Sequence, residues 1–256
     1  MSSLARITVF PIKALSGIDL DSCSITGAGT LSNDRSFALK DEKLRFVNGK
    51  RHPEVNQILS NFDLEQQTVT LDLYGFEDPQ TFELREGNGP LEEWFSDFFG
   101  FQIRVEENSE NGFPDDTKRS GPTIISTSTL EEVASWYPEI SVDEVRRRFR
   151  SNLELGECPA FWEDQLNEIP DQGVRFQLGG VTFEGLKHSV RCPVPSQDTR
   201  TGEAYLDFQK VFMQKREETL PRWIEKSEFG HYYRLAINTR IVHCLAELKL
   251  SDKIKL

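Results

Sequence analysis

The sequence predicts a mainly β fold of barrel-like architecture with only a few short helices. Short apolar runs separated by turn residues recur along the chain, few segments space their apolar residues as a helix does, and no internal repeat or low-complexity tract is present. Many short strands with few helices favour a β-barrel over a doubly wound sheet.

The first hundred residues are rich in expected strands. An early strand over residues 7–12 runs into Pro11, and apolar residues alternate with polar ones over 69–73, as in a half-buried strand. The run Gly87-Asn88-Gly89-Pro90 then breaks the chain, and apolar residues over 91–98 follow at the spacing of a short amphipathic helix. We therefore expect one β-rich unit here, over residues 1–101.

The second unit is expected to span residues 102–256, and its helices have recognisable start signals. A hydroxyl at the N-cap with a carboxylate three residues later forms a capping box. Two segments have this spacing, Ser128 with Glu131 before a helix over 129–137, and Ser141 with Glu144 before a helix over 142–148. A further helix is expected over 207–215.

The other segments of this unit are expected to be a linker and strands. The polar stretch from Glu106 to Arg119, with its glycine and proline, is the best candidate for an exposed linker. Strands are expected at residues 122–126, 174–177, 181–183, 232–236 and 248–256.

Composition narrows the classes of function. The chain has 256 residues, 37% of them hydrophobic, and its net charge of −12 argues against nucleic acid as the main partner. No apolar run approaches the roughly 18 residues of a membrane span, and the N-terminus reads as a strand with no signal peptide. The four cysteines lie far apart without a CxxC pair, which excludes a disulfide scaffold and the usual iron–sulfur or zinc-finger patterns. We expect a soluble, reduced, cytoplasmic protein.

Cys192 is the most informative residue of the chain. It follows Arg191 and is confined by Pro193 and Pro195, so it lies in a stiff segment beside a cation. A neighbouring guanidinium favours the thiolate, the form that binds soft metals or attacks substrates. On local sequence alone the alternative stays open, since a lone cysteine is more often a small buried hydrophobic residue.

Cys192 belongs to one of four separated islands that combine a cation with small or polar residues. These islands are FPIKALSG at residues 10–17, NDRSF at 33–37, RFRSN at 148–152, and RCPVPSQDTRTG at 191–202. Each island alone is weak evidence for a functional site, because a cation at a strand end or at a helix C-terminus is usually solvated.

Together the islands resemble the MOSC proteins, a family named for the C-terminal domain of molybdenum cofactor sulfurase, combined with their N-terminal barrel-like domain. The branch with the mitochondrial amidoxime-reducing component and its bacterial relatives has the most similar pattern. The resemblance extends through GPTIISTSTL, FGHYYRLA and the closing LKLSDKIKL, and thus covers nearly the whole chain. It implies an N-terminal barrel-like unit packed on a MOSC β-barrel, with a pocket between the two.

The resemblance also implies a site for a molybdenum cofactor, a molybdopterin. Cys192 would ligate the molybdenum, and the pterin and phosphate would be held by Lys13, Arg35, Arg150, Asn152 and Arg191. Ser120 and Gly121 fall where the family also touches the cofactor. Arginine forks suit the phosphate and ring acceptors of such a ligand, and a thiolate suits a soft metal site.

The activity implied is that of an oxidoreductase that reduces N-oxygenated small molecules by oxygen-atom transfer. Since the sequence has no dinucleotide, haem or iron–sulfur motif, electrons would come from a separate protein such as a ferredoxin or a flavin reductase. Two alternatives are a non-catalytic cofactor carrier or sulfur-transfer module, and a barrel whose site has lapsed. No pyridoxal phosphate is expected, because in the sulfurase that chemistry belongs to another domain.

Several residues depart from the family pattern or have more than one possible role. Ala14 and Val190 stand where relatives have hydroxyl residues, and Ser251 replaces a usual glycine, which is tolerable if its φ stays negative. Asp198 is either a catalytic carboxylate on the substrate side or the cap of the turn before Thr201. His188 could shuttle protons or be structural. Cys158 and Cys244 are expected to be packing residues.

Overall fold

The computed structural model describes residues 2–116, 120–167, 173–224, 226–244 and 247–256. It confirms the mainly β fold, because most of its regular elements are strands paired in sheets. The strands of the largest sheet are β1 (Ser3–Val9), β2 (Ile18–Leu20), β9 (Ile124–Ser126), β10 (Leu153–Gly156), β11 (Val174–Leu178), β12 (Val181–Val190), β13 (Arg234–Cys244) and β15 (Ile254–Lys255).

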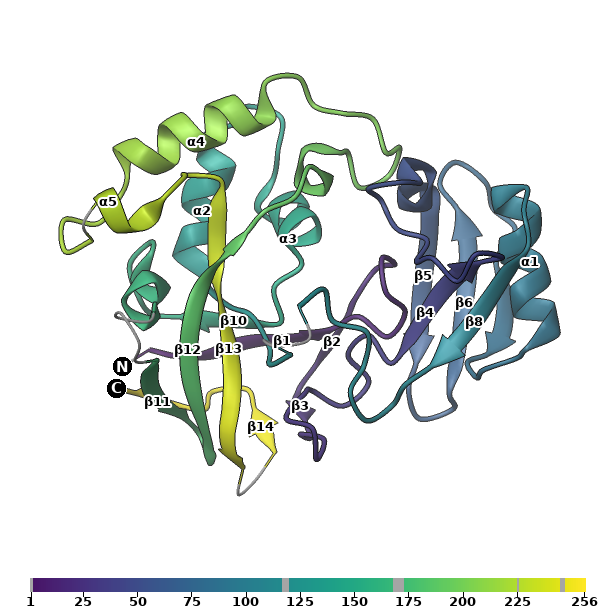
Figure 1. Ribbon diagram of the computed structural model, residues 1–256, viewed down its shortest axis with the longest axis horizontal. Helices are drawn as coiled ribbons and strands as arrows, with labels where there is room; N and C mark the ends of the chain where they lie inside the picture. Colours follow the sequence, from purple (N-terminus) through teal and green to yellow (C-terminus); the bar gives the residue numbers. More distant parts are fainter. Residues whose placement is uncertain (1, 117–119, 168–172, 225, 245–246) are drawn as a thin grey trace.

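This large sheet is an open sheet that contains both parallel and antiparallel strand pairs. The strands lie in the order β15-β11-β12-β13-β9-β10-β1-β2, with β9 and β10 parallel and the other pairs antiparallel (Figure 1). Within the described part of the chain the strands therefore form no closed barrel, unlike the expected one. The edge strand β15 still comes near β1, the strand next to the other edge, because Leu4 N donates to Asp252 O (2.8 Å) and Ile254 N donates to Ser2 O (3.1 Å).

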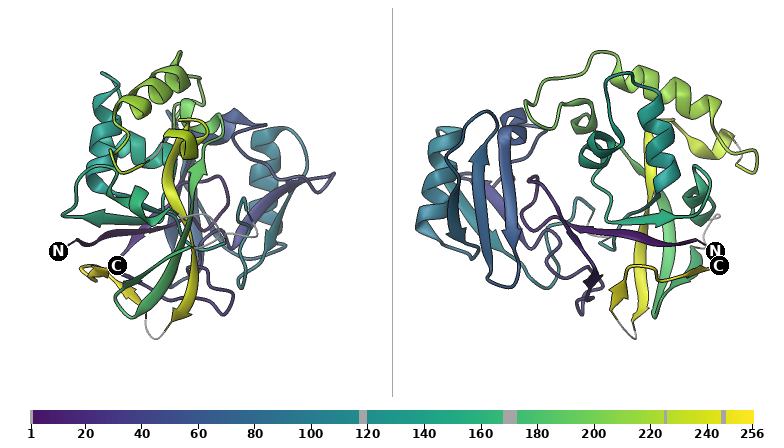
Figure 2. Two further views of the ribbon diagram at one scale, coloured as in Figure 1. Left: turned by 60° about the vertical axis from the view of Figure 1, so that its left-hand side comes forward. Right: turned by 180° about the vertical axis from the view of Figure 1, so that it is seen from behind.

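Residues 37–107 form a smaller unit beside this sheet (Figures 1 and 2). Strand β4 pairs with β8, and the hairpin strands β5, β6 and β7 form a second small sheet. The elements of the small unit are β4 (Phe37–Asp41), the 3₁₀ turn η1 (Pro53–Gln57), β5 (Ile58–Asp63), β6 (Thr68–Leu73), β7 (Gln80–Glu83), α1 (Gly89–Phe99) and β8 (Ile103–Glu107). Its own apolar core, centred on Leu71 and Phe95, is separate from that of the large sheet.

The remaining helices cover one side of the large sheet and have a third apolar cluster, rich in aromatic residues, beneath them. These elements are α2 (Thr127–Ser135), α3 (Val142–Phe149), η2 (Trp162–Leu166), η3 (Val194–Ser196), α4 (Phe208–Glu218) and α5 (Lys226–Phe229). A two-stranded sheet of β3 (Ser22–Cys23) and β14 (Leu248–Lys249) completes the fold. Among the helices described, none is long and apolar enough to span a membrane.

The two units interlock at the start of the chain. Strand β1 lies inside the large sheet between β2 and β10, whereas the residues that follow reach the small unit, where Lys13 N donates to Phe37 O (2.8 Å). The proposed boundary between 101 and 102 stays a prediction, since the chain on either side of it contributes to both units.

Three local predictions need correction. Helix α2 begins two residues earlier than expected, because Ser126 and not Ser128 is its N-cap and accepts from Thr129 N (3.2 Å). The expected strand over 232–236 is the start of the longer β13. Ser251 has a φ of +71°, so the closing turn between β14 and β15 keeps the left-handed backbone that favours glycine.

The expected linker is correct only in part, because residues 108–116 form no helix or strand but contact the rest of the fold. Strand β8 extends to Glu107, and the following residues pack on the loop around Arg35, where Phe113 N donates to Arg35 O (2.8 Å). At Gly112, with φ +63°, a Cβ atom would lie 2.7 Å from Asp34 O, which explains the glycine. Residues 117–119 lie outside the described residues.

Candidate functional site

A cavity of about 780 Å³ lies between the large sheet and the small unit. It is lined from both, by the segments around Lys13 and Arg35 near the N-terminus and by those around Arg150 and Cys192. Among the described residues, eleven Lys and Arg side chains and six Asp and Glu side chains line it, on a chain whose net charge is −12. The cavity is therefore a cationic hollow in an acidic protein and would concentrate an anionic ligand.

Lys13 is a buried cation at one wall of this cavity. Its side chain is 7% exposed, and its Nζ donates to Phe113 O (2.8 Å) and to the Asp115 carboxylate (2.5 Å). Burial lowers the pKa of Lys13, although the charge of Asp115 opposes this shift. Both partners come from the segment that the sequence suggests as a linker, so that segment is part of the site.

Arg35 and Arg150 meet at the ring of Phe10. The Arg35 guanidinium lies 5.2 Å from the ring centroid and pairs with Asp34, whose carboxylate also accepts from Phe10 N (3.0 Å). The Arg150 guanidinium lies 4.1 Å from the same centroid and donates to Leu15 O. Cation–π contact with one shared ring holds the two arginines close together.

The proximity of these cations is electrostatically unfavourable without an anion. Burial, and after it the charge of Arg35, lowers the pKa of Arg150 to about 9. Arg150 keeps its proton at neutral pH, so the site holds several positive charges against their mutual repulsion. An anion bound between them would relieve this repulsion.

Arg191 connects the cysteine segment to the end of α3. Its Nη2 donates to Phe149 O (2.7 Å), its Nη1 to Ser189 Oγ (3.0 Å), and its backbone N to Tyr233 O (3.0 Å). The Nε atom is buried without a hydrogen-bond partner in the described structure. Burial lowers the pKa of Arg191, and the adjacent Cys192 counteracts this. Cys192 itself is a free, partly exposed cysteine at the cavity wall.

We refer to Lys13, Arg35, Arg150 and Arg191 as the cavity cations. Two of them, Arg35 (φ 54°) and Arg150 (φ 53°), have left-handed backbone, as does Ala14 (φ 77°), which follows Lys13. Such conformations cost a non-glycine residue on the order of 1 kcal/mol or more and cluster at functional sites. The backbone at the cavity is thus held in a form that its residue types do not favour.

Two of the expected cofactor residues, Asn152 and Gly121, also make structural contacts in the fold. Asn152 is 2% exposed, and its amide accepts from Thr123 N (3.2 Å) and donates to Thr8 O (3.1 Å), which ties β1 to the chain before β9. At Gly121, a Cβ atom would lie 2.5 Å from Thr239 O, so the glycine permits close packing on β13. Both residues line the cavity, as does Ser120.

Asp198 lies apart from the cavity cations. It lines a separate, shallower hollow, and its Oδ1 accepts from Arg200 N and Thr201 N (both 2.9 Å). Of the two roles suggested for Asp198 by the sequence, this geometry supports the cap of the turn before Thr201 over the catalytic carboxylate.

His188 and the cysteines outside the cavity also take structural places. His188 lines the cavity, but its ring contacts Asp164 (2.9 Å) and packs on Phe229, in a buried polar group beneath α4 and α5. Cys158 is buried in the core of the large sheet. The side chain of Cys244 lies outside the described residues.

Two residues missed by sequence reasoning line the cavity. The Ser151 hydroxyl and the Arg234 Nε are both buried without hydrogen-bond partners in the described structure. Ser151 stands inside the RFRSN island, so its position between Arg150 and Asn152 was the available signal. Arg234 lies in a segment that reads only as a strand, and nothing in its sequence context marks it.

These observations fit an anionic ligand with polar acceptors. The cavity lies within the usual size range of small-molecule sites. Its unpartnered buried donors, Ser151 Oγ and Arg191 Nε, would each gain a hydrogen bond from such a ligand. The thiol of Cys192 adds a soft ligand at the wall, which suits the metal of a molybdopterin.

Comparison with known proteins points to the same family. Residues 1–102 match the family described as the MOSC N-terminal beta barrel domain. The chain is 23% identical over 257 residues to a protein named molybdenum cofactor sulfurase from Caenorhabditis elegans, and 20% identical over 255 residues to one of that name from Caenorhabditis briggsae. Each alignment covers 90% of this chain but 34% of the relative, so the chain spans about a third of the length of these proteins. These findings support the resemblance to the MOSC proteins drawn from the motifs, through the family match over residues 1–102 and the distant similarity to proteins named molybdenum cofactor sulfurase.

Proposed function

We propose that this protein binds a molybdenum cofactor in the cavity and reduces N-oxygenated small molecules. The observation that carries the proposal is that the four cavity cations and Cys192, which come from distant parts of the sequence, line one cavity. Fold and family alone would leave the function open, because function depends on the site.

The cavity cations would hold the anionic end of the cofactor. Lys13, Arg35 and Arg150 lie near one another around Phe10 and Asp115, and together they offer several donors to a phosphate. Charge-assisted hydrogen bonds of this kind are about twice as strong as neutral ones. Arg191 and Ser151 would donate to the polar ring system.

Cys192 would hold the metal through its sulfur. The adjacent Arg191 carries the positive charge that favours a thiolate, and the prolines on the far side of Cys192 limit movement of its backbone. When bound, the cofactor would supply the oxygen-atom and two-electron chemistry that no side chain can perform. The electrons would come from a separate donor protein.

A second candidate, sulfur transfer or cofactor carriage, has specific support. Both of the relatives described above are named molybdenum cofactor sulfurase, and this chain spans about a third of each. Such a module would use the same cavity to hold the cofactor, so the two functions differ in what happens after binding.

The experiment that separates these functions uses protein purified from a host that makes the molybdenum cofactor. We expect molybdenum and pterin phosphate near one equivalent each, and turnover of hydroxylamines or amidoximes with a reduced viologen dye as electron donor. Stoichiometric cofactor without turnover would favour the carrier. A protein that contains neither molybdenum nor pterin would refute both functions.

A further inference from the structure

The segment after Cys192 bridges the two units. We call residues 193–207 the strap; they run from Cys192 to α4 and cross from the large sheet to the small unit (Figures 1 and 2). We propose that Arg148 is a positioning residue that holds Cys192 at the cavity wall by fixing the strap onto α3.

Arg148 binds the strap close to the cysteine. Its Nη1 donates to Pro195 O (3.0 Å), three residues after Cys192. The side chain is only 4% exposed, and its guanidinium lies 5.5 Å from the centroid of the Phe208 ring. Glu144, one turn earlier in α3, pairs with it at 2.8 Å. Arg148 thus has a fixed position from which to hold the Pro195 carbonyl.

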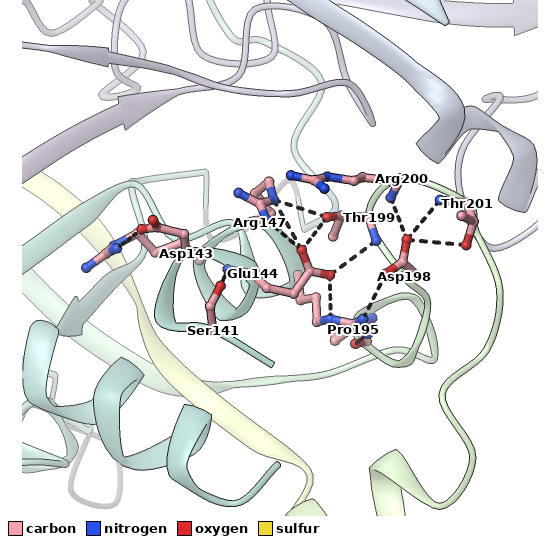
Figure 3. Close-up of polar contacts among 11 residues, drawn as sticks. Ser141, Asp143, Glu144, Arg147, Pro195, Asp198, Thr199, Arg200 and Thr201 are labelled. Carbon is pink, nitrogen blue, oxygen red and sulfur yellow. Dashed lines mark hydrogen bonds and ion pairs between the residues drawn. The ribbon is translucent and has the colours of Figure 1, made fainter. Parts of the chain in front are cut away.

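Glu144 supplies a second anchor (Figure 3). In a capping box its carboxylate would bond back to the N-cap residue Ser141, but here it accepts from Thr199 Oγ1 (2.7 Å) and Thr199 N (3.2 Å) on the strap. Burial raises the pKa of Glu144, yet the hydrogen bonds from Thr199 and Arg147 outweigh burial and lower it overall. The glutamate therefore stays ionised and bound to the strap at neutral pH.

The strap is also fixed on the side of the small unit. Gln197 donates to Gly49 O (2.8 Å) and accepts from Asn56 Nδ2 (3.1 Å). At Gly202 a Cβ atom would lie 2.3 Å from Pro53 O, so the tip of the strap packs closely on η1. Asp198 makes that tip rigid by capping its turn.

The side chain of Cys192 is not fixed by hydrogen bonds as the strap is. Among the described residues, no hydrogen bond is made by its thiol. Its place follows from the backbone on either side, where Arg191 N donates to Tyr233 O (3.0 Å) and Pro195 O accepts from Arg148. These two anchors are four residues apart, so loss of the Arg148 anchor frees the cysteine on its strap side.

The inference rests on the proposed function only for the metal-binding role of Cys192. Its test measures the position of the thiol directly, in the full chain purified from a host that makes no molybdenum cofactor. The readout is the rate at which iodoacetamide alkylates Cys192, followed by peptide mass spectrometry, with the buried Cys23 and Cys158 as internal references.

Arg148→Gln should raise the alkylation rate of Cys192 about tenfold, which is the scale of one lost charge-assisted hydrogen bond. Arg148→Lys should restore part of the native rate, because an ammonium can still reach a carbonyl oxygen. Thr199→Val loses the hydroxyl's bonds to Glu144 and Arg147 but keeps the bond from its backbone N to Glu144, so it should give a smaller rise. It serves as the second variant if Arg148→Gln fails to fold. The matched control is Arg240→Gln, which breaks an exposed ion pair with Glu184 outside the cavity and should leave the rate unchanged.

A second readout separates positioning from general loosening. Inorganic phosphate should raise the melting temperature of Arg148→Gln as much as that of the native protein, because the cavity cations remain. An unchanged alkylation rate of Cys192 in folded Arg148→Gln and Thr199→Val proteins would overturn the proposal. It would also be overturned if phosphate no longer raised the melting temperature of Arg148→Gln, because the substitution would then have disturbed the whole cavity. Absence of molybdenum from the protein would refute the proposed function while leaving these rates as they are.

Discussion

Two of the places where the protein buries charge differ in how that charge is balanced. Beneath α4 lies the α4 cluster, which consists of Glu163, Asp164, His188 and Arg216. Arg216 is fully buried between the rings of Phe161 and Phe229, and pairs with Asp164. At the cavity, by contrast, eleven Lys and Arg side chains of the described residues line the wall with only six Asp and Glu side chains.

This difference distinguishes a structural cluster from a binding site. In the α4 cluster the Asp164 carboxylate contacts both Arg216 and His188, so opposite charges within the protein join α4 to η2 and β12. The Nε and Nη1 atoms of Arg216 nevertheless have no hydrogen-bond partner in the described structure. At the cavity, Lys and Arg side chains exceed the acids, and unpartnered donors such as Ser151 Oγ and Arg191 Nε line a hollow in which a bound anion would accept from them. Substitutions in the α4 cluster should therefore affect stability, and those at the cavity should affect binding.

The largest expected effect is on turnover, from Cys192→Ser. Serine is nearly isosteric, so the free energy of unfolding should change by no more than about 1–2 kcal/mol. The hydroxyl is a poor soft ligand at neutral pH, and reductase turnover should fall by orders of magnitude. Cys158→Ser, in the core of the large sheet, should leave turnover largely intact. Wild-type turnover in Cys192→Ser would remove the metal-ligand role.

The next effect is on stability, from Asp164→Asn. This change leaves Arg216, which is 0% exposed, without its carboxylate partner. Breaking a buried ion pair in this way costs about 3–5 kcal/mol, measurable by urea unfolding. Phosphate binding at the cavity should be unchanged. A loss below about 1 kcal/mol would show that Glu163 takes over the negative charge.

Arg150→Ala should affect ligand binding more than stability, the reverse of Asp164→Asn. Loss of one charge-assisted contact at the cavity costs roughly 1.5–3 kcal/mol and should lower cofactor occupancy by at least about tenfold. Stability without ligand should fall less than that, or rise, because removing a cation relieves repulsion from Arg35. Molybdenum content measured by mass spectrometry decides the outcome, and full content would contradict the role of Arg150.

The α4 cluster should also make stability depend on pH. Burial, and after it the charge of Asp164, raises the pKa of Glu163 from its ordinary 4.5 to about 7. The folded protein then binds more protons than the unfolded chain between these values, so the free energy of unfolding falls as pH rises from about 4.5 to 7. We expect this loss to be at least about 1 kcal/mol. Glu163→Gln should abolish that part of the pH dependence in urea melts recorded across this range, and an unchanged slope would place its source elsewhere.

The same two regions show how far sequence reasoning reaches. The motifs correctly indicated that residues near 13, 35, 150 and 192 share one cavity, because each motif carries local chemistry that the family resemblance could connect. The α4 cluster could not be found, since Asp164, His188 and Arg216 have no local pattern and meet only through tertiary packing. The strap was missed for a similar reason, because a capping box predicts a local bond for Glu144 and the fold redirects its carboxylate to Thr199.

The smallest expected effect comes from left-handed backbone, which occurs both at the cavity and far from it. Ser251 (φ 71°) adopts this conformation in the turn between β14 and β15, away from the cavity, whereas Arg150 adopts it beside Phe10. Ser251→Gly should raise the free energy of unfolding by about 0.5–1 kcal/mol, because glycine tolerates positive φ and part of that gain is offset by its greater freedom in the unfolded chain. Phosphate binding should not change. Arg150→Gly relieves the same backbone strain but should lose phosphate affinity, since its guanidinium is gone. If thermal melts show Ser251→Gly to be less stable than the native protein, the backbone at this turn is held by contacts of the serine side chain and the strain argument fails there.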